Sequence, residues 1–190
     1  MFSWFKKKEP AAPSLMDRVW LNRASAERAI VRAAQAGPLA VLCFFDDTHA
    51  RLSAALGAAG LAPGRALVIE RVDQLSLVPA GAAVIVAERH PVSGFNRALA
   101  QKLATLAPGV TPTCYSGLDD PLMKLFGGDR LVEVMRQLGL SEDEPVEHPM
   151  ISKALTNASQ KLEQRLGPAL SRLAPAASMA EWMQKNVPPE

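Results

Sequence analysis

Short apolar runs alternate with helical stripes of apolar residues over roughly the first 115 residues. Four runs have the length and composition of buried strands: residues 39–45, 66–70, 82–87 and 110–115. Between them, apolar residues at helical spacing follow Asn22, Thr48 and Ser93, and each of these side chains is placed to cap a first turn. Strands that alternate with helices of this length favour parallel βαβ units. The pattern therefore predicts an α/β fold, with a parallel sheet covered by helices on both faces.

The remaining third of the chain has helical periodicity. Two short helices are expected between Asp119, which caps the first, and Gly139, which ends the second. From Met150 onward, apolar residues recur every three to four, or seven, positions: Ile151, Leu155, Ala158, Leu162, Leu166 and Leu173. This spacing predicts one long helix with a single apolar stripe, and another short helix is expected around Trp182.

The connector before the long helix indicates how the chain is divided. Residues 141–149 carry four acidic residues and two prolines, which predicts an exposed break. We therefore expect three segments: a flexible aromatic and basic tail with its linker at 1–14, an α/β domain at 15–140, and an acidic connector with a helical extension at 141–190.

The tail has the composition of a membrane-interface segment. Three aromatic residues stand directly before three lysines: Phe2, Trp4, Phe5, Lys6, Lys7 and Lys8. Aromatic rings favour the headgroup region, and each lysine gains about 1 kcal/mol near anionic lipid. A segment this short predicts weak, reversible contact with a membrane surface. The alternative is a disordered tail with incidental aromatics.

Composition narrows the class of protein. The chain has 190 residues, of which 48% are hydrophobic and 21% charged, and its net charge is +2, which is ordinary for a globular domain. The small positive excess does not predict a nucleic-acid-binding face. No apolar run reaches the roughly 18 residues that span a bilayer, and the order of basic and apolar residues does not predict a signal peptide. Cys43 and Cys114 lie in apolar runs, which predicts buried free thiols in a reducing cytosol.

Acidic residues follow the first predicted strand, but the partners of a catalytic site are missing. Asp46 and Asp47 resemble the acidic end of a Walker B strand or of a phosphoacceptor receiver domain. A Walker-type site also needs G-x-x-x-x-G-K-[ST], which the sequence lacks, and a receiver needs an aspartate where Glu88 stands. We therefore expect a strand-end pair that caps a helix. The histidines and cysteines share no metal-ligand spacing, so neither a metal nor another cofactor is expected.

A long irregular run resembles the SecA family of preprotein-translocase motor ATPases. The family has, in this order, the elements L-E-D-D-L-M-R-L-F-G and E-D-E-P-I-E-H-P-M, at the end of its second nucleotide-binding domain and the start of its helical scaffold. Matching residues here include Leu118, Asp119, Asp120, Met123, Glu147, His148, Pro149, Met150, Ala154 and Lys161. The resemblance implies a RecA-like parallel sheet corresponding to the second motor lobe, followed by the beginning of the scaffold.

The nucleotide motifs of that family are eroded here. Glu88-Arg89-His90 resembles the family's T-E-R-H, but the G-R-x-G-R core that follows has lost its arginines and glycines. Lys102 and Thr105 stand at the two arginine positions. Removing one such arginine typically costs on the order of 10³ in rate, and lysine lacks the planar fork that holds phosphate. The resemblance thus implies no hydrolysis by this chain, and it leaves Arg89 and Lys102 as candidate nucleotide contacts.

These observations predict a non-catalytic, SecA-like interaction module that is cytoplasmic and attaches peripherally to the inner face of the cytoplasmic membrane. The resemblance implies SecA or the translocase as the protein partner. The expected partner surface is the acidic connector together with four residues of the long helix: Ile151, Leu155, Leu162 and Leu166. The alternative for this helix is that it packs back on its own domain. Two other functions remain open, a nucleotide-binding half-site completed in trans by another chain and a receiver-like signalling domain.

Overall fold

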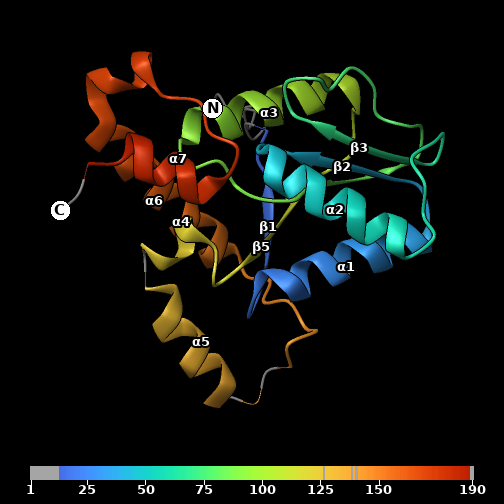
Figure 1. Cartoon of the computed structure of the whole chain (residues 1–190), viewed down its shortest axis with the longest axis horizontal. Coiled ribbons are helices and arrows are strands. Elements are labelled where there is room, and N and C mark those ends of the chain that lie inside the picture. The colour runs from blue at the N-terminus through green and yellow to red at the C-terminus, as the bar shows by residue number, and fades with distance from the viewer. Residues whose placement is uncertain (1–12, 126, 138, 140, 189–190) are drawn as a thin grey trace, which may run out of the picture.

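A single parallel sheet forms the centre of the molecule (Figure 1). The computed structural model describes residues 13–188 apart from 126, 138 and 140. The five strands are β1 (Met16–Trp20), β2 (Leu39–Cys43), β3 (Leu67–Arg71), β4 (Ala83–Val86) and β5 (Thr113–Gly117). Every pair is parallel, and the order across the sheet is β1-β5-β4-β2-β3. The predicted α/β class with a RecA-like sheet is confirmed in its general form.

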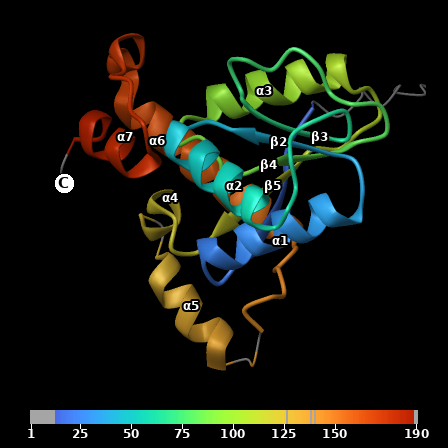
Figure 2. The ribbon, with the colours of Figure 1, turned by 45° about the vertical axis from the view of Figure 1, so that its right-hand side comes forward.

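Helices cover both faces of this sheet, as the continuous apolar strands require. The helices are α1 (Arg23–Ala36), α2 (Asp46–Ala58), α3 (Ser93–Leu106), α4 (Pro121–Lys124), α5 (Gly128–Gln137), α6 (Pro149–Leu166) and α7 (Met179–Asn186), with a 3₁₀ turn, η1, at Gly167–Arg172. One face packs against α1 and α2, and the other against α3, α6 and α7. Figure 2 separates α3 on one side of the sheet from α1 on the other, and α5 projects away from the sheet beyond α4.

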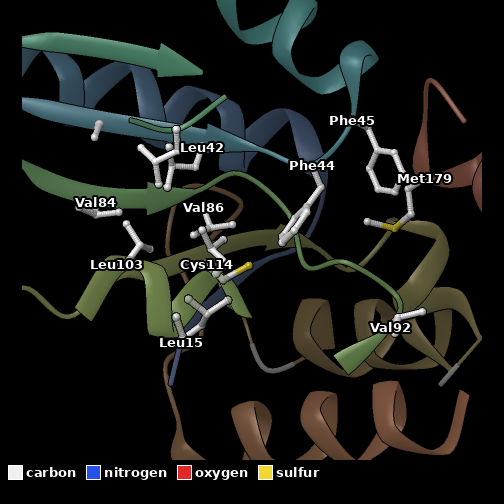
Figure 3. Packing of buried hydrophobic residues seen from close by; sticks show 14 of the residues in the cluster. Leu15, Leu42, Phe44, Phe45, Val84, Val86, Val92, Leu103, Cys114 and Met179 are labelled. Carbon is white, nitrogen blue, oxygen red and sulfur yellow. The ribbon is translucent and has the colours of Figure 1, made fainter. Parts of the chain in front are cut away.

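The larger of the two cores lies on the α3 face. Leu42 of β2 packs there with Val84 and Val86 of β4 and with Leu103 of α3, as Figure 3 shows. All five residues of β2 are buried, which explains why its sequence is a continuous apolar run rather than an alternating one. Truncating a side chain such as Leu42 to alanine typically costs about 2–5 kcal/mol.

The edge strand β1 was not predicted, and its polar residues explain why. Asp17 and Arg18 interrupt the apolar pattern of Met16–Trp20, which therefore does not stand out as a strand. The structure compensates both charges: Asp17 pairs with Arg89, and Arg18 pairs with Glu147 over 2.6 Å. The sheet consequently has one strand more than the sequence pattern indicated.

Three predicted caps were assigned to the wrong residue. α2 begins at Asp46, so Thr48 lies inside its first turn instead of capping it, and α3 begins at Ser93, with Val92 in the cap position. The short helix α4 is preceded by Asp120 rather than by Asp119. In each case a tertiary contact uses the polar side chain that local sequence rules assign to the cap.

The long C-terminal helix is shorter than predicted. Its first residue is Pro149, with His148 as the cap, and it ends at Leu166 because Gly167 takes a positive φ of 47°. The chain continues through η1, and α7 holds the buried Trp182 against the α3 face. Among the helices described, none has the length and apolar composition needed to cross a bilayer. The membrane-contact residues Phe2, Trp4, Phe5, Lys6, Lys7 and Lys8 lie outside the described part of the chain.

Candidate functional site

The Gly117–Asp120 run, which carries much of the resemblance to SecA, closes the junction between β1 and α1. Asp119 Oδ1 accepts from the backbone N–H of Arg23 over 2.6 Å, and Asp120 Oδ1 receives the Arg23 guanidinium at 2.6 Å. Burial raises the pKa of the Asp120 carboxyl, and the Arg23 guanidinium opposes that shift. A Cβ added at Gly117 would lie 2.3 Å from the Arg23 nitrogen, so only glycine fits. Asp119 and Asp120, which match the SecA family, therefore have a structural role here.

Beside this junction lies an apolar groove of about 600 Å³. Its floor is Val19 of β1 with Leu118 and Met123, and its walls are α5 and α6. We call it the α5–α6 groove and define it by the residues that line it: Val19, Leu118, Met123, Leu131, Met135, Val146, Ile151, Ala154, Leu155, Asn157, Ala158 and Lys161. Lys161 is the one charged side chain among these residues.

The α5 wall of the groove leaves apolar side chains in contact with solvent. Leu131 is 50% exposed, and Met135 and Val132 are only partly buried against the small cluster formed by β1, α4 and α6. Met150, at the start of α6, is exposed as well. Contiguous apolar surface of this kind marks interaction sites on globular proteins.

Most of the predicted partner surface on α6 is buried in the chain's own core. Leu162 and Leu166 pack into the α3-face core, and Leu155 packs into the cluster of Val19 and Met123. The alternative, that this helix packs back on its own domain, therefore describes these three residues. Of the four residues expected to meet a partner, Ile151 is the one that is only partly buried, and it lines the groove.

Polar contacts fix α6 at two levels. Ser152 Oγ accepts from the backbone N–H of Asp17 over 3.1 Å, and Glu163 accepts from the hydroxyl of Ser93 and from the N–H of Gly94 at 3.2 Å. The helix is thereby joined to the edge strand β1 and to the first turn of α3. The groove consequently has one wall held firmly against the sheet.

The acidic connector is partly tied to the domain rather than free. Asp143 lies 3.4 Å from the guanidinium groups of both Arg28 and Arg32, and Val146 forms a backbone bridge with Val19. The side chains of Asp143 and Arg28 are about half exposed, so these pairs contribute little stability. The connector was predicted to be an exposed break, and most of its residues are exposed.

Glu88 is a buried carboxyl group at the end of the sheet. Its Oε1 accepts from the backbone N–H groups of Phe44 and Phe45, each at 3.1 Å, and its Oε2 accepts from Thr48 Oγ1 at 2.6 Å. The carboxylate thus occupies the N-terminus of α2, where a bound anion would otherwise be stabilised. Burial raises the Glu88 pKa to about 7, against the effect of these hydrogen bonds.

The two candidate nucleotide contacts lie in different environments. Arg89 is buried and binds both oxygens of Asp17, at 2.5 and 2.6 Å, so its guanidinium already has a partner. Lys102 is exposed on α3 and lines a second cavity near the ends of β2 and β3. The hydroxyl of Thr105 donates a hydrogen bond to the backbone carbonyl of Gln101. The structure does not bring Arg89 and Lys102 together in one cavity.

The acidic residues after β2 both form ion pairs within the domain. Asp47 pairs with Arg51 one turn along α2, and Asp46 pairs with Arg71 at the end of β3. Cys43 and Cys114 are free and buried, and burial raises the pKa of both thiols. Within the described residues, no group of three histidine, cysteine, aspartate or glutamate side chains is placed to hold a metal ion.

Comparison with known proteins finds sequence similarity to SecA over about half of this chain. Protein translocase subunit SecA of Acinetobacter baylyi is 39% identical over 97 residues, which are 50% of this chain and 11% of the relative. SecA of Acidithiobacillus ferrooxidans is 37% identical over 90 residues, and SecA of Acinetobacter baumannii is 41% identical over 86. The resemblance expected from the sequence is confirmed.

The extent of this similarity is limited. The matched part spans about a tenth of the length of these relatives, between 9% and 11%. No family model matches the chain.

Proposed function

We propose that this chain is a non-catalytic relative of a SecA segment that acts in protein translocation by binding a protein partner in the α5–α6 groove. The observation that carries the proposal is the composition of that groove. Four of its lining residues are among those that match the SecA family: Leu118, Met123, Ala154 and Lys161. The same run therefore combines similarity to a translocase subunit with exposed apolar surface.

The expected occupant is an apolar segment of SecA or of the translocase. An amphipathic helix can place its apolar face in such a groove, with anchors spaced by three to four residues. The groove offers apolar contacts from Ile151, Leu131 and Met135, with Lys161 at its edge. An acidic residue that flanks the apolar anchors of the partner would pair with Lys161.

The absence of catalysis is proposed on two grounds. The sequence has no G-x-x-x-x-G-K-[ST] phosphate loop, and Lys102 and Thr105 stand where the family has its paired arginines. Among the residues present, Arg89 is committed to Asp17. We accordingly expect no ATP turnover by the purified chain.

A Leu131→Glu variant tests the proposed surface. Leu131 is half exposed, so the charge can enter the groove without entering the core. Leu77→Glu is the matched control, because Leu77 is 65% exposed and lies in the loop between β3 and β4. Binding to purified SecA and to translocase-containing membranes should fall at least tenfold for Leu131→Glu and stay unchanged for Leu77→Glu. Equal binding by both variants would remove the groove from the proposal.

The competing function is a nucleotide half-site completed by another chain. Lys102, exposed beside a cavity, is the observation in its favour. Titration calorimetry with ATP and with ADP, alone and with purified SecA added, separates the two functions. Saturable binding in the micromolar range that is lost in Lys102→Met would favour the half-site.

A further inference from the structure

The second cavity lies where an open parallel sheet usually binds its ligand. It has a volume of about 380 Å³ and is lined by Phe44 after β2, Arg71 and Asp73 at the end of β3, His90 after β4, and Phe95 and Lys102 of α3. From β2 the chain passes through α2 on one face, and from β4 it passes through α3 on the other. Neighbouring strands whose connections diverge in this way leave a crevice at their carboxyl ends, which is the preferred ligand position in α/β sheets.

Three rings of an aromatic cluster around His90 line this cavity: Phe44, His90 and Phe95. The His90 ring centroid lies 5.3 Å from that of Phe44, 4.4 Å from Phe95 and 5.2 Å from Trp182. Phe45 stacks on the same ring at 5.7 Å, and Figure 3 shows Phe44 and Phe45 leaving the end of β2. Phe95 remains 47% exposed although it lines the cavity. An exposed ring at a cavity wall is available for a planar ligand to stack on.

His90 supplies a directed hydrogen-bond donor. Its Nδ1 accepts from the backbone N–H of Val92 over 3.0 Å, so the proton of the neutral ring lies on Nε2. Burial lowers the His90 pKa to about 4, and the ring is therefore neutral at physiological pH. In the part of the chain that is described, Nε2 has no hydrogen-bond partner. It is not one of the fully buried side-chain atoms that lack a partner, which belong to Glu70, Arg71 and Ser159. Nε2 is thus in contact with accessible space.

Three charged side chains line the cavity, Arg71, Asp73 and Lys102, and together they carry one positive charge. Arg71 pairs with Asp46, and its Nε lies 3.5 Å from Asp73, so its charge is compensated. Lys102 forms no ion pair with any described residue and is exposed. One uncompensated lysine beside aromatic rings fits a ligand that carries a single negative charge on a planar apolar body.

We infer that this cavity binds a small planar aromatic carboxylate, whose ring lies against Phe44 and Phe95 and whose carboxylate pairs with Lys102. His90 Nε2 donates to an acceptor on the ligand. The volume lies within the usual 300–1,000 Å³ range for small-molecule pockets, toward the small end that suits one or two fused rings. A nucleoside triphosphate fits poorly, because several negative charges would face one lysine and Asp73 with no glycine-rich loop to hold the phosphates. This inference does not rest on the α5–α6 groove.

Titration calorimetry with 2-naphthoate tests the inference, with 2-naphthylmethanol as the uncharged probe of the same ring. Naphthoate should bind the wild-type chain saturably, and naphthylmethanol should bind at least tenfold more weakly. Lys102→Met removes the charge from an exposed site and should weaken naphthoate binding at least tenfold. Lys161→Met is the matched control, because Lys161 lines the other apolar groove, and it should leave the affinity unchanged.

The opposite results overturn the inference in distinct ways. Equal affinity of wild type and Lys102→Met would exclude this cavity, and loss of binding in Lys161→Met would place naphthoate in the α5–α6 groove. Tighter, Lys102-dependent binding of ATP than of naphthoate would assign the cavity to nucleotides instead. Backbone amide shifts give a second readout, and naphthoate should move those of His90, Phe95 and Lys102 before any others.

Discussion

Arg89 and Asp17 form a buried ion pair that joins the edge strand β1 to the loop between β4 and α3, with Nε–Oδ1 and Nη2–Oδ2 distances of 2.5 and 2.6 Å. The side chain of Asp17 has no exposed surface and that of Arg89 is 6% exposed. Burying two charges is favourable only when both are paired and hydrogen-bonded. This geometry makes Arg89 a structural residue rather than a free contact for phosphate.

Arg89→Met should therefore destabilise the fold by about 3–5 kcal/mol, because it leaves the Asp17 carboxylate buried without a partner. The double variant Asp17→Leu/Arg89→Met removes both charges and should recover most of that loss. Urea unfolding followed by circular dichroism measures both. Arg28→Met is the control: Arg28 pairs with Asp143 at the surface, and its loss should cost less than about 1 kcal/mol. If Arg89→Met is as stable as the wild type, Arg89 is not a structural residue and is again a candidate for binding nucleotide.

The Glu88 carboxyl should make stability depend on pH. Its pKa is about 7 in the folded chain, against 4.5 for a glutamate in water, so the folded state binds a proton more readily than the unfolded state. The stability that this group contributes is complete below about pH 4.5 and declines as pH rises through 7, by roughly 3 kcal/mol at most. Glu88→Gln, which mimics the protonated group, should lack this decline.

Urea unfolding at pH 5 and pH 8 measures the Glu88 effect as a difference between wild type and Glu88→Gln. Because other groups also titrate in this range, only the difference between the two proteins is attributed to Glu88. Parallel pH profiles of the two proteins would show that Glu88 stays ionised in the fold, held by Thr48 and the N–H groups at the start of α2.

Gly117→Ala should destabilise the chain by at least about 3 kcal/mol. The added Cβ would approach the backbone nitrogen of Arg23 and the carbonyl carbon of Asn22 to 2.3 and 2.6 Å, and neither backbone atom can move without shifting α1. Gly57→Ala is the matched control, since a Cβ at this helical position meets nothing within 4 Å. It should be neutral, or stabilising by up to about 1 kcal/mol. Similar thermal stabilities of the two variants would contradict the tight β1–α1 junction.

The sequence predicts those elements whose pattern is set by neighbouring residues, and it misses those that depend on contacts between distant residues. The run at residues 39–45 is continuous and apolar because β2 is buried on both faces, and its short length between Pro38 and Asp46 identifies it as a strand. The strand β1 was not predicted because Asp17 interrupts its apolar pattern. The partner of Asp17, Arg89, lies 72 residues further along the chain. Thr48 was predicted to cap a helix because local rules consider only neighbouring residues. In the structure its hydroxyl donates to Glu88, which lies 40 residues further along the chain.

The two cavities illustrate the same limit for the functional site. The apolar stripe of α6 was visible in the sequence, but which members face the sheet depends on how the helix packs, and Leu155, Leu162 and Leu166 turned inward. The α5–α6 groove draws its lining from Val19 as far as Lys161, and no sequence pattern joins those positions. The cavity beside His90 likewise assembles from the ends of separate strands and α3.

The tail at residues 1–9 should account for any attachment to membranes. Replacing Lys6, Lys7 and Lys8 by glutamate removes about 1 kcal/mol of lipid attraction per lysine and adds repulsion from anionic headgroups. Sedimentation with vesicles of phosphatidylglycerol and phosphatidylcholine should show loss of binding in this variant. Glutamate at Lys161, Lys153 and Lys185 gives a control of equal charge. If the control loses binding as much as the tail variant, contact with lipid does not depend on the tail.

Photo-crosslinking in living cells tests whether a translocation protein binds in the α5–α6 groove. A benzophenone amino acid at Leu131 places the reactive group at the groove, and the same residue at Leu77 places it at an exposed leucine elsewhere. Binding of a partner in the groove predicts a crosslink from position 131 to SecA or to a translocase component, with no such product from position 77. Identical crosslinking patterns from both positions, or capture of no translocation protein at position 131, would contradict it.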